Sequence, residues 1–509
     1  MILIIRKIFF IFIYLKIISK KNISFLDLNF RKIDFTNYNQ IKNFIFKKNF
    51  FIIKNRDIHS FDFLNFSSKL GGKIGINLSK ESIYGWYSIN KHKMGYPWSE
   101  DLSSRRLINL LYNYEYINSS SKLADRKKLD SIIYNHMQRI LFDFNTKKIS
   151  EITSFDILAF LLSSLLLKKF NDKKLKFIKF IVETQIDKLG IHKSYNLLEH
   201  AKFINNLNEI KNIYLFFKIN NANTLDTIVL KMTSTLKQYF HDDGTLPLFN
   251  GSNNSYTKII NDSLNKVTYL KKREFSNNNG IAYYSDKNKK IFYDVVQPNQ
   301  DRVSSNLNAG TLSFELSGFG EKIITNCGAS ESSGKNPEYL RYSAAHSTII
   351  LQNTNISEIK EGNPHKKFPQ SVVFQKESDL NNEIFEGSHN GYLNKFNKIV
   401  KRKLVISKNE NKLIGEDSLI SYKKTNNRII YHIRFHLADE ITFNFTNNKK
   451  NIILKTKLNN IWLFKSETEL LVEDSILVDS NITKLTKQIV IKGVITDKKI
   501  IRKWSLEKI

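Results

Sequence analysis

The sequence places an arginine and a histidine five residues apart, at Arg341 and His346, directly before the apolar run Ile349-Ile-Leu351. A loop rich in Ser, Gly and Asn precedes them, so both side chains are expected at a loop-to-strand junction, where functional groups are often held on a rigid scaffold. An imidazole exchanges a proton near neutral pH, and a guanidinium can bind a carboxylate or sulfate through two parallel hydrogen bonds. The structural alternative is that Arg341 pairs with a carboxylate and His346 is a hydrogen-bonded core residue.

Two strand-like segments upstream would position this pair. Residues 311–316 alternate between polar and apolar types, which predicts a strand with Leu312, Phe314 and Leu316 on one face. Residues 323–328 predict a second strand that ends at a glycine.

After residue 265 the chain is patterned for an antiparallel β-sandwich, because short runs rich in aromatic and β-branched residues alternate with polar turns. A polar Ser-Lys-Asn-Glu-Asn segment between two of these runs predicts a hairpin. Beyond the segments already named, we expect strands over 281–284, 290–296, 398–406, 412–417, 429–437 and 460–464.

The preceding part, from about residue 43 to residue 264, is patterned for helices. Polar clusters at 118–121 and 219–224 predict turns between them, and strand-like alternation is rare, so an all-α domain of paired helices is predicted. Apolar residues recur near helical spacing, or run together, in three segments: 130–144, 151–167 and 175–189.

The composition bounds the class of protein. With 509 residues, 41% of them hydrophobic, the chain is long enough for two cores, and global disorder is not expected. The net charge of +31 raises the question of a polyanionic partner. The basic residues are scattered rather than gathered beside stacking aromatics, and the abundance of Lys, Asn and Ile is typical of AT-rich coding, so no nucleic-acid binding is predicted. The single cysteine, Cys327, excludes an intramolecular disulfide and is predicted to be a small buried residue.

The N-terminal segment, residues 1–40, is apolar and basic, with Arg6, Lys7 and Lys16 inside its apolar stretch. No small-residue cleavage site follows, which argues against a secretory signal, and the embedded charges argue against a membrane span. An amphipathic basic helix is expected here, in contact with a membrane surface or with the rest of the protein.

The order A-G-x-L-S-F-E, N-C-G and R-x-x-A-A-H-S-T, between Asn308 and Thr348, resembles the heparinase II/III-like family, in particular an uncharacterised bacterial branch of it. The resemblance extends from about Tyr84 to the C-terminus. Its other matching stretches are 98–109, 243–251, His389-Asn-Gly-Tyr392, Gly415-Glu-Asp417 and Ile433-Arg-Phe-His436.

This resemblance implies a multidomain α-then-β fold, an incomplete α/α toroid followed by an antiparallel β-sandwich. We therefore expect a helical domain over residues 41–268 and a β-sandwich domain over residues 269–509. The activity it implies is β-elimination of a polysaccharide that contains uronic acid, with or without sulfate. That reaction needs a group that neutralises the carboxylate, a base for the C5 proton and an acid for the leaving 4-oxygen.

The resemblance also implies which residues do this chemistry. Asn196 is the expected amide that neutralises the carboxylate, Tyr256 the expected acid, and His346 the imidazole of the site. Relatives tend to read N-H-L-L-E-N around Asn196, which would place Tyr195 at the amide position, and the structural alternative for Asn196 is an N-cap for the helix 197–207. The alternative for Tyr256 is a partly buried helix residue; Tyr239 is the fallback for the acid, and His241 is predicted to be a solvated loop residue.

Relatives commonly carry histidine where this chain has Asn308, and asparagine cannot act as a general base at neutral pH. We therefore expect Asn308 to contact the substrate, together with Arg341, His389 and Tyr392, although the Asn-Gly turn explains the last two structurally. Either Tyr256 or His346 would then abstract the proton.

No metal and no cofactor are predicted. The leading hypothesis is a polysaccharide lyase with an acidic polysaccharide as its partner and a periplasmic or cell-envelope location, with the cytoplasm as the alternative. The alternative function is a catalytically inactive glycan-binding or envelope-associated protein on the same scaffold.

Overall fold

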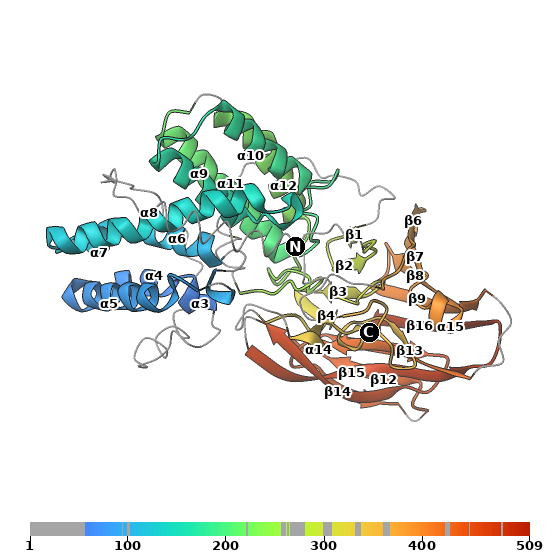
Figure 1. Ribbon diagram of the computed structural model, residues 1–509. Coiled ribbons are helices and arrows are strands. Elements are labelled where there is room, and N and C mark those ends of the chain that lie inside the picture. The colour runs from blue at the N-terminus through green and yellow to red at the C-terminus, as the bar shows by residue number, and fades with distance from the viewer. Residues whose placement is uncertain are drawn as a thin grey trace. The chain divides into compact units, whose positions relative to one another are not determined.

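The protein was analysed as a computed structural model, shown in Figure 1, which describes residues 56–93, 95–98, 102–219, 222–255, 261, 264, 280–298, 308–330, 337–359, 367–422, 428–446, 448–479 and 482–509. The expected N-terminal segment 1–40 and the expected boundary at residue 268 lie outside these ranges. The chain forms two compact units, one from the described residues of 1–182 with 205–225, and one from those of 183–204 with 226–509.

Within the described ranges, the part of the chain before residue 240 is helical, as the sequence predicts. The segments 130–144, 151–167 and 175–189 correspond to α8, α9 and α10. The α-helices are α3 (Arg56–His59), α4 (Phe63–Leu70), α5 (Gly72–Asn90), α6 (Leu102–Tyr112), α7 (Tyr114–Asn118), α8 (Leu123–Thr146), α9 (Ser154–Leu166), α10 (Asp172–Thr184), α11 (Leu197–Phe216) and α12 (Asp226–Lys237).

Helix α9 begins at a capping box. The Thr153 hydroxyl accepts the Asp156 N–H at 3.2 Å, and the Asp156 carboxylate accepts the Thr153 N–H at 3.0 Å. Two of the N–H groups that a helix start leaves unpaired are thereby satisfied. Asp156 also pairs with Lys147, at 2.7 Å, so this cap is linked to the end of α8.

A buried arginine organises the core of the helical unit. The Arg106 guanidinium lies over the rings of Trp86 and Trp98, at 4.0 and 4.5 Å, and its Nε donates to His136 Nε2 at 2.9 Å. Burial lowers the pKa of Arg106 well below its usual value. The aromatic faces supply the negative potential that stabilises a desolvated cation.

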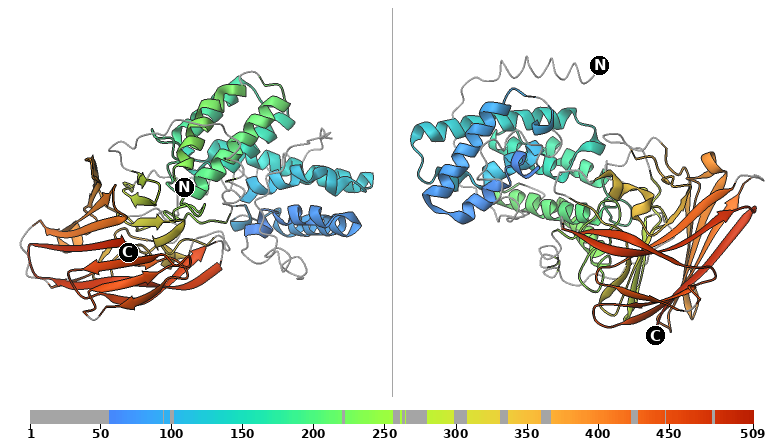
Figure 2. Two further views of the ribbon diagram at one scale, coloured as in Figure 1. Left: turned by 180° about the vertical axis from the view of Figure 1, so that it is seen from behind. Right: turned by 90° about the horizontal axis from the view of Figure 1, so that it is seen from below.

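The strands form two eight-stranded antiparallel sheets, visible as two layers in the right-hand view of Figure 2. The first sheet contains β1 (Ile281–Ser285), β2 (Lys289–Asp294), β3 (Phe314–Gly318), β4 (Glu321–Thr325), β5 (Ile349–Leu351), β10 (Ile429–Leu437), β14 (Leu471–Asp479) and β15 (Ile482–Ile495). The second contains β6 (Val372–Ser378), β7 (Asn382–His389), β8 (Lys398–Ser407), β9 (Lys412–Ser421), β11 (Thr442–Phe445), β12 (Asn451–Lys455), β13 (Ile461–Ser466) and β16 (Lys499–Lys508).

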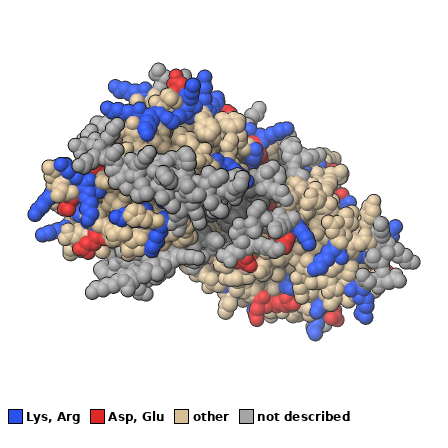
Figure 3. Space-filling model, viewed as in Figure 1, with Lys and Arg blue, Asp and Glu red and all other residues tan. Residues whose placement is uncertain are grey.

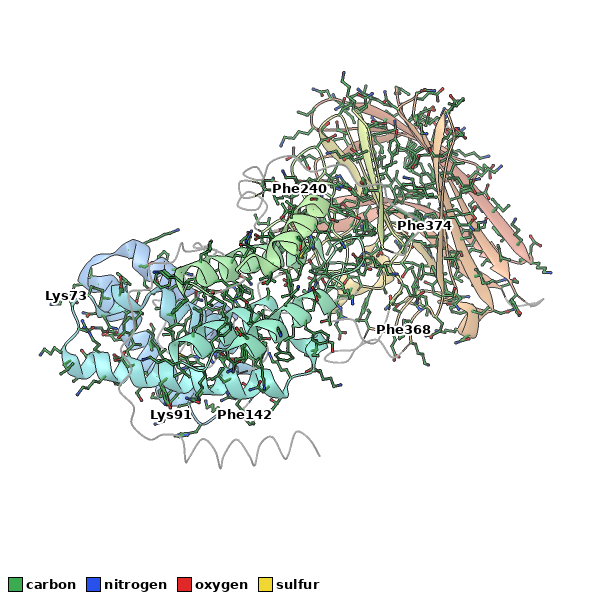
Figure 4. All side chains as sticks on the ribbon, turned by 90° about the horizontal axis from the view of Figure 1, so that it is seen from above. Lys73, Lys91, Phe142, Phe240, Phe368 and Phe374 are labelled. Atoms are coloured by element: carbon green, nitrogen blue, oxygen red, sulfur yellow. The ribbon has the colours of Figure 1, made fainter. Side chains whose placement is uncertain are left out.

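Aromatic side chains from both sheets meet in the sandwich core. Trp504 of β16 stacks on Phe314 of β3, with ring centroids 5.5 Å apart, and meets Phe435 of β10 edge-on at 4.7 Å. Phe374 of β6, labelled in Figure 4, packs edge-on against Tyr293 of β2. The period-two burial along β7 and β8 follows from this arrangement, since alternate residues face the opposite sheet.

The predicted strands and the hairpin between β8 and β9 are confirmed. Two details of the expectation are wrong. The strand expected over 323–328 is β4, which ends at Thr325 and not at Gly328. The strand β3 begins at Phe314 rather than at Thr311, because Leu312 adopts a left-handed conformation, φ 63°, in a turn closed by the Ser313 N–H on Gly310 O. Every residue of β3 is buried.

Basic side chains are spread over the surface. On the face shown in Figure 3, Lys and Arg lie over both the helices and the strands, with Asp and Glu among them. Within the ranges that the structure describes, no helix is both long and apolar enough to span a bilayer.

Candidate functional site

The segment that carries His346 is held by its small hydroxyl residues. Ser343 donates to Ala309 O at 2.7 Å, Ser347 to Thr325 O at 2.7 Å, and Thr348 to Thr311 O at 2.8 Å. The short 3-10 turn Ser343–Ala345 precedes His346, and β5 follows it. The Ala-Ala-His-Ser-Thr sequence thus places His346 at a loop-to-strand junction, as predicted, and fixes the backbone on both sides of it.

The His346 imidazole is buried, with 1% of the residue exposed, and packs against Gly310. A Cβ at position 310 would lie 3.0 Å from His346 Cγ, so any other residue there would require the ring to shift by a few tenths of an ångström. Both ring nitrogens lack a hydrogen-bond partner in the described part of the chain. Burial lowers the pKa of His346 to about 4, with Glu315 opposing, so the ring is neutral at pH 7.

Asn308 and Arg341 lie on two stretches of backbone that adjoin the His346 segment. The Ala309 N–H donates to Arg341 O at 2.9 Å, and the Asn308 N–H donates to Asn250 Oδ1 at 3.5 Å. Burial lowers the pKa of Arg341, and nearby Glu338 opposes the shift. The structure therefore brings three of the predicted site residues, Asn308, Arg341 and His346, onto adjoining stretches of backbone.

Asn196 occupies the N-cap of α11, the alternative considered from the sequence. Its Oδ1 accepts the Glu199 N–H at 3.0 Å, and its own N–H donates to Ser194 Oγ at 3.2 Å. Tyr195, the neighbouring candidate position, has φ 51° and donates to Asp187 at 3.2 Å. The Asn196 amide oxygen is thus engaged in capping, while Tyr256 lies outside the described residues.

His389 is the last residue of β7, Tyr392 follows three residues later, and both are buried. His389 Nδ1 accepts the Gly391 N–H at 3.1 Å, and burial lowers the pKa of His389 to about 3. The Tyr392 hydroxyl donates to Thr354 O at 2.8 Å, just beyond β5. These contacts favour a structural role, in which Tyr392 holds the chain that follows His346.

The fallback acid, Tyr239, is fully engaged elsewhere. Its hydroxyl donates to Ile281 O at 2.7 Å, and burial, followed by nearby Tyr283, raises its pKa well above the usual value.

The expectation for His241 is wrong: it is a buried residue. Its Nδ1 lies 2.7 Å from Ser317 Oγ, and its Nε2 lies 3.1 Å from Glu315 Oε2. The other Glu315 oxygen accepts the Leu248 N–H at 2.9 Å and Asn326 Nδ2 at 3.0 Å. The Asp-Asp-Gly turn after His241 suggested a solvent-exposed side chain. In the structure, β3, which is distant in sequence, covers the ring.

Glu315 is a residue that sequence reasoning missed. Burial would raise its pKa, but Lys322 and His241 outweigh burial and hold the pKa below its usual value. Through its hydrogen bonds, the carboxylate links the segment 241–248 to Asn326, which follows β4. An acidic residue inside the apolar run Leu-Ser-Phe-Glu-Leu was the available signal, because an acid in a buried strand requires partners.

The prediction for Cys327 is confirmed, since the thiol is buried. Its Sγ lies 3.5 Å from His436 Nδ1, and burial raises its pKa to about 11. Among the residues that the structure describes, no three His, Cys, Asp or Glu side chains are grouped so as to hold a metal ion.

Comparisons with known proteins add to this geometry. Residues 270–505 match the family model described as "Heparinase II/III-like, C-terminal". A search of curated proteins by sequence found no match.

Several solved structures share the fold. A crystal structure of heparinase III aligns with a TM-score of 0.68 at 14% identity, over 89% of this chain and 76% of that one. The heparan sulfate lyase HepC from Pedobacter heparinus aligns with a TM-score of 0.57 at 13% identity, over 88% and 76%. The chondroitin AC lyase of Streptomyces coelicolor, solved with chondroitin sulphate, aligns with a TM-score of 0.51 at 6% identity, over 89% and 74%. At these identities the likeness establishes the fold, a helical region followed by two antiparallel sheets.

Proposed function

Since residues 270–505 belong to the heparinase II/III-like C-terminal family, we propose that this protein is a polysaccharide lyase that cleaves a uronic-acid-containing polysaccharide, with or without sulfate, by β-elimination. The observation that carries the proposal is the state of His346. It is a neutral, buried imidazole with both nitrogens unpartnered in the described part of the structure, on a backbone held from both sides. The free energy spent on desolvating a polar ring without a partner is typical of a functional group rather than of a core residue.

In this reaction His346 is the base. Its free nitrogen takes the C5 proton of the uronate, the C4–O bond breaks, and a C4–C5 double bond forms. The leaving oxygen takes a proton from an acid, for which Tyr256 remains the candidate. A neutral imidazole is the form that can accept a proton, and its low pKa is expected to rise when a bound carboxylate lies beside it.

The substrate class rests on the structural neighbours. HepC is a heparan sulfate lyase, a second neighbour is a heparinase, and the chondroitin AC lyase was solved with chondroitin sulphate. We therefore propose an acidic polysaccharide for this chain too, and a periplasmic or cell-envelope location, which fractionation of cells would test.

One observation favours a second candidate, a glycan-binding protein without catalysis. Asn308, which stands where relatives commonly carry histidine, cannot act as a general base. If Asn196 is no substrate ligand and no other amide replaces it, the carboxylate is not neutralised and elimination stalls.

Ultraviolet absorbance of the unsaturated uronide product separates the two candidates. Purified protein is incubated with heparan sulfate, heparin, chondroitin sulfate and alginate, and binding of each polymer is measured in parallel. Product from at least one polymer, lost in His346→Ala with binding retained, supports the lyase. Binding without product from any of these polymers favours the binding protein.

A further inference from the structure

The loop that reaches Asn308 carries buried donors with no acceptor. Within its residues 250–253, Asn250 Nδ2, Ser252 Oγ and Asn253 Nδ2 have no hydrogen-bond partner in the described structure. The three residues are 3%, 0% and 1% exposed. Buried polar groups are almost always paired in folded proteins, so three unpaired ones in four residues need an explanation.

This loop is anchored at both ends, so its unpaired donors do not arise from a loose segment. The Leu248 N–H donates to Glu315 Oε1 at 2.9 Å. At the other end the Asn254 N–H donates to Asp479 Oδ1 at 2.9 Å, and Asn254 Oδ1 accepts the Leu246 N–H at 2.7 Å. Between these anchors the backbone at Asn250 is left-handed, with φ 52°, a conformation that asparagine tolerates well.

The orientation of the Asn250 amide is set by its neighbour. Its Oδ1 accepts the Asn308 N–H, so the two hydrogens on Nδ2 are the part left for another acceptor. Asn308 is two residues from Gly310, against which the His346 ring packs. The unpaired amide and the unpaired imidazole therefore flank the same short stretch, 308–310.

The charges of the neighbouring groups indicate what these donors would take. Amide and hydroxyl hydrogens donate to oxyanions, and neutral donors in a buried site bind them strongly because little competing water is present. The two carboxylates that anchor this loop have other partners: Glu315 contacts His241, Leu248 and Asn326, and Asp479 contacts Asn254.

We propose that Asn250, Ser252 and Asn253 form an oxyanion subsite beside His346, which receives a carboxylate or sulfate of the acidic glycan. This inference rests on the proposed substrate class. It places an amide that faces the anion at Asn250, whose Nδ2 has no hydrogen-bond partner in the described structure. In the lyase reaction, a carboxylate held there would have its charge stabilised as the C5 proton leaves.

The test is an isosteric charge change. Asn250→Asp keeps the left-handed backbone, which aspartate also tolerates, but replaces the donor with an anion. Asn409→Asp, at an exposed hairpin position, makes the same change in net charge and is the matched control. Affinities for heparan sulfate, carboxyl-reduced heparan sulfate and desulfated heparan sulfate are measured by calorimetry at physiological salt, in the His346→Ala background so that no polymer is cleaved.

We expect Asn250→Asp to weaken binding of heparan sulfate at least tenfold, with Asn409→Asp near the parent value. If the bound group is a carboxylate, the loss disappears with the carboxyl-reduced polymer; if it is a sulfate, the loss disappears with the desulfated polymer. Asn253→Asp should show the same pattern and replaces Asn250→Asp if that variant does not fold.

Equal affinities for Asn250→Asp, Asn253→Asp and Asn409→Asp would mean that water alone satisfies these donors, and would overturn the proposal. A parent protein that binds none of the polymers would also overturn it. Activity separates this inference from the proposed function. Asn250-dependent binding without any lyase product leaves the subsite standing and removes the lyase. Lyase activity whose kcat/KM is the same in Asn250→Asp and Asn409→Asp removes the subsite and leaves the lyase.

Discussion

Arg402 and Asp417 form a two-pronged ion pair inside the β-sandwich, with Nε to Oδ1 at 2.6 Å and Nη2 to Oδ2 at 3.0 Å. The remaining guanidinium nitrogen, Nη1, donates to Leu312 O at 3.0 Å and to Ser347 O at 2.7 Å. Ser347 follows His346 directly. Arg402 and Asp417 lie on neighbouring strands of the second sheet, β8 and β9. Through Arg402 Nη1, this pair binds the backbone of the candidate site.

Asp417→Asn should therefore destabilise the protein strongly. It leaves a buried guanidinium without its counter-charge, and removing one partner of a buried pair typically costs about 3–5 kcal/mol. Urea unfolding measures the change. The control is Glu386→Gln, which removes the partner of half-exposed Lys401, at 2.6 Å, and should cost about 1 kcal/mol or less. Equal costs for the two variants would show that the Arg402 pair is not a structural support.

His346→Leu should lose activity and keep stability. The imidazole nitrogens have no partner in the described structure, so an apolar side chain of similar size removes a desolvated polar group without breaking a hydrogen bond. We expect a change in unfolding free energy within about 1 kcal/mol and a fall in kcat of about 100-fold or more. A loss of several kcal/mol on thermal or urea unfolding would instead show that His346 is a structural residue.

Asn196 can be tested in both of its roles with two variants. Asn196→Asp retains a good N-cap, whereas Asn196→Ala removes it and should cost about 1 kcal/mol. If the residue only caps α11, kcat/KM stays at the parental value in Asn196→Asp. If the amide also neutralises the substrate carboxylate, Asn196→Asp loses activity at unchanged stability, because it places a second negative charge beside the first.

Stability should fall as the pH drops from about 6.5 toward 4. Burial lowers the pKa of His192 and His346 to about 4, and that of His200, His389 and His436 to about 3. These residues titrate near 6.5 in the unfolded chain, so the unfolded state binds more protons in that window and is favoured by acid. Above pH 6.5 the contribution is fully present.

Each of these histidines contributes on the order of 2–3 kcal/mol across the window. Unfolding free energies measured from pH 7.5 to 4.5 should show the slope, and His389→Asn should reduce it. A flat profile over this range would mean that the imidazoles are not desolvated.

Cys327 should be unreactive in the folded protein. Burial raises the pKa of its thiol to about 11, so almost no thiolate is present at pH 7. A maleimide reagent should label the native protein far more slowly than protein unfolded in urea, and the labelling should follow the unfolding curve. Rapid labelling under native conditions would contradict the buried position.

Local patterning determined much of the architecture. Helical spacing before residue 240 and the short aromatic and β-branched runs after residue 280 correspond to the helices and strands, because periodicity follows directly from which face of an element is buried. The N-cap at Asn196, the buried Cys327 and the junction at His346 were also accessible, since each depends on residues close in sequence.

Contacts between distant residues were decided only by the tertiary structure. The local sequence predicted a solvated loop residue at His241, but Glu315 and Ser317, more than 70 positions away, contact its ring. The same holds for Arg402 reaching Ser347, and for Asn250 meeting Asn308. Burial and pairing of a polar group depend on which segments the sheets bring together, and no local pattern records that pairing. The sequence identified the strands around His346. The packing of those strands determined that its imidazole is neutral and has no hydrogen-bond partner among the described residues, and that Asn250 contacts Asn308, two residues before the Gly310 on which the ring packs.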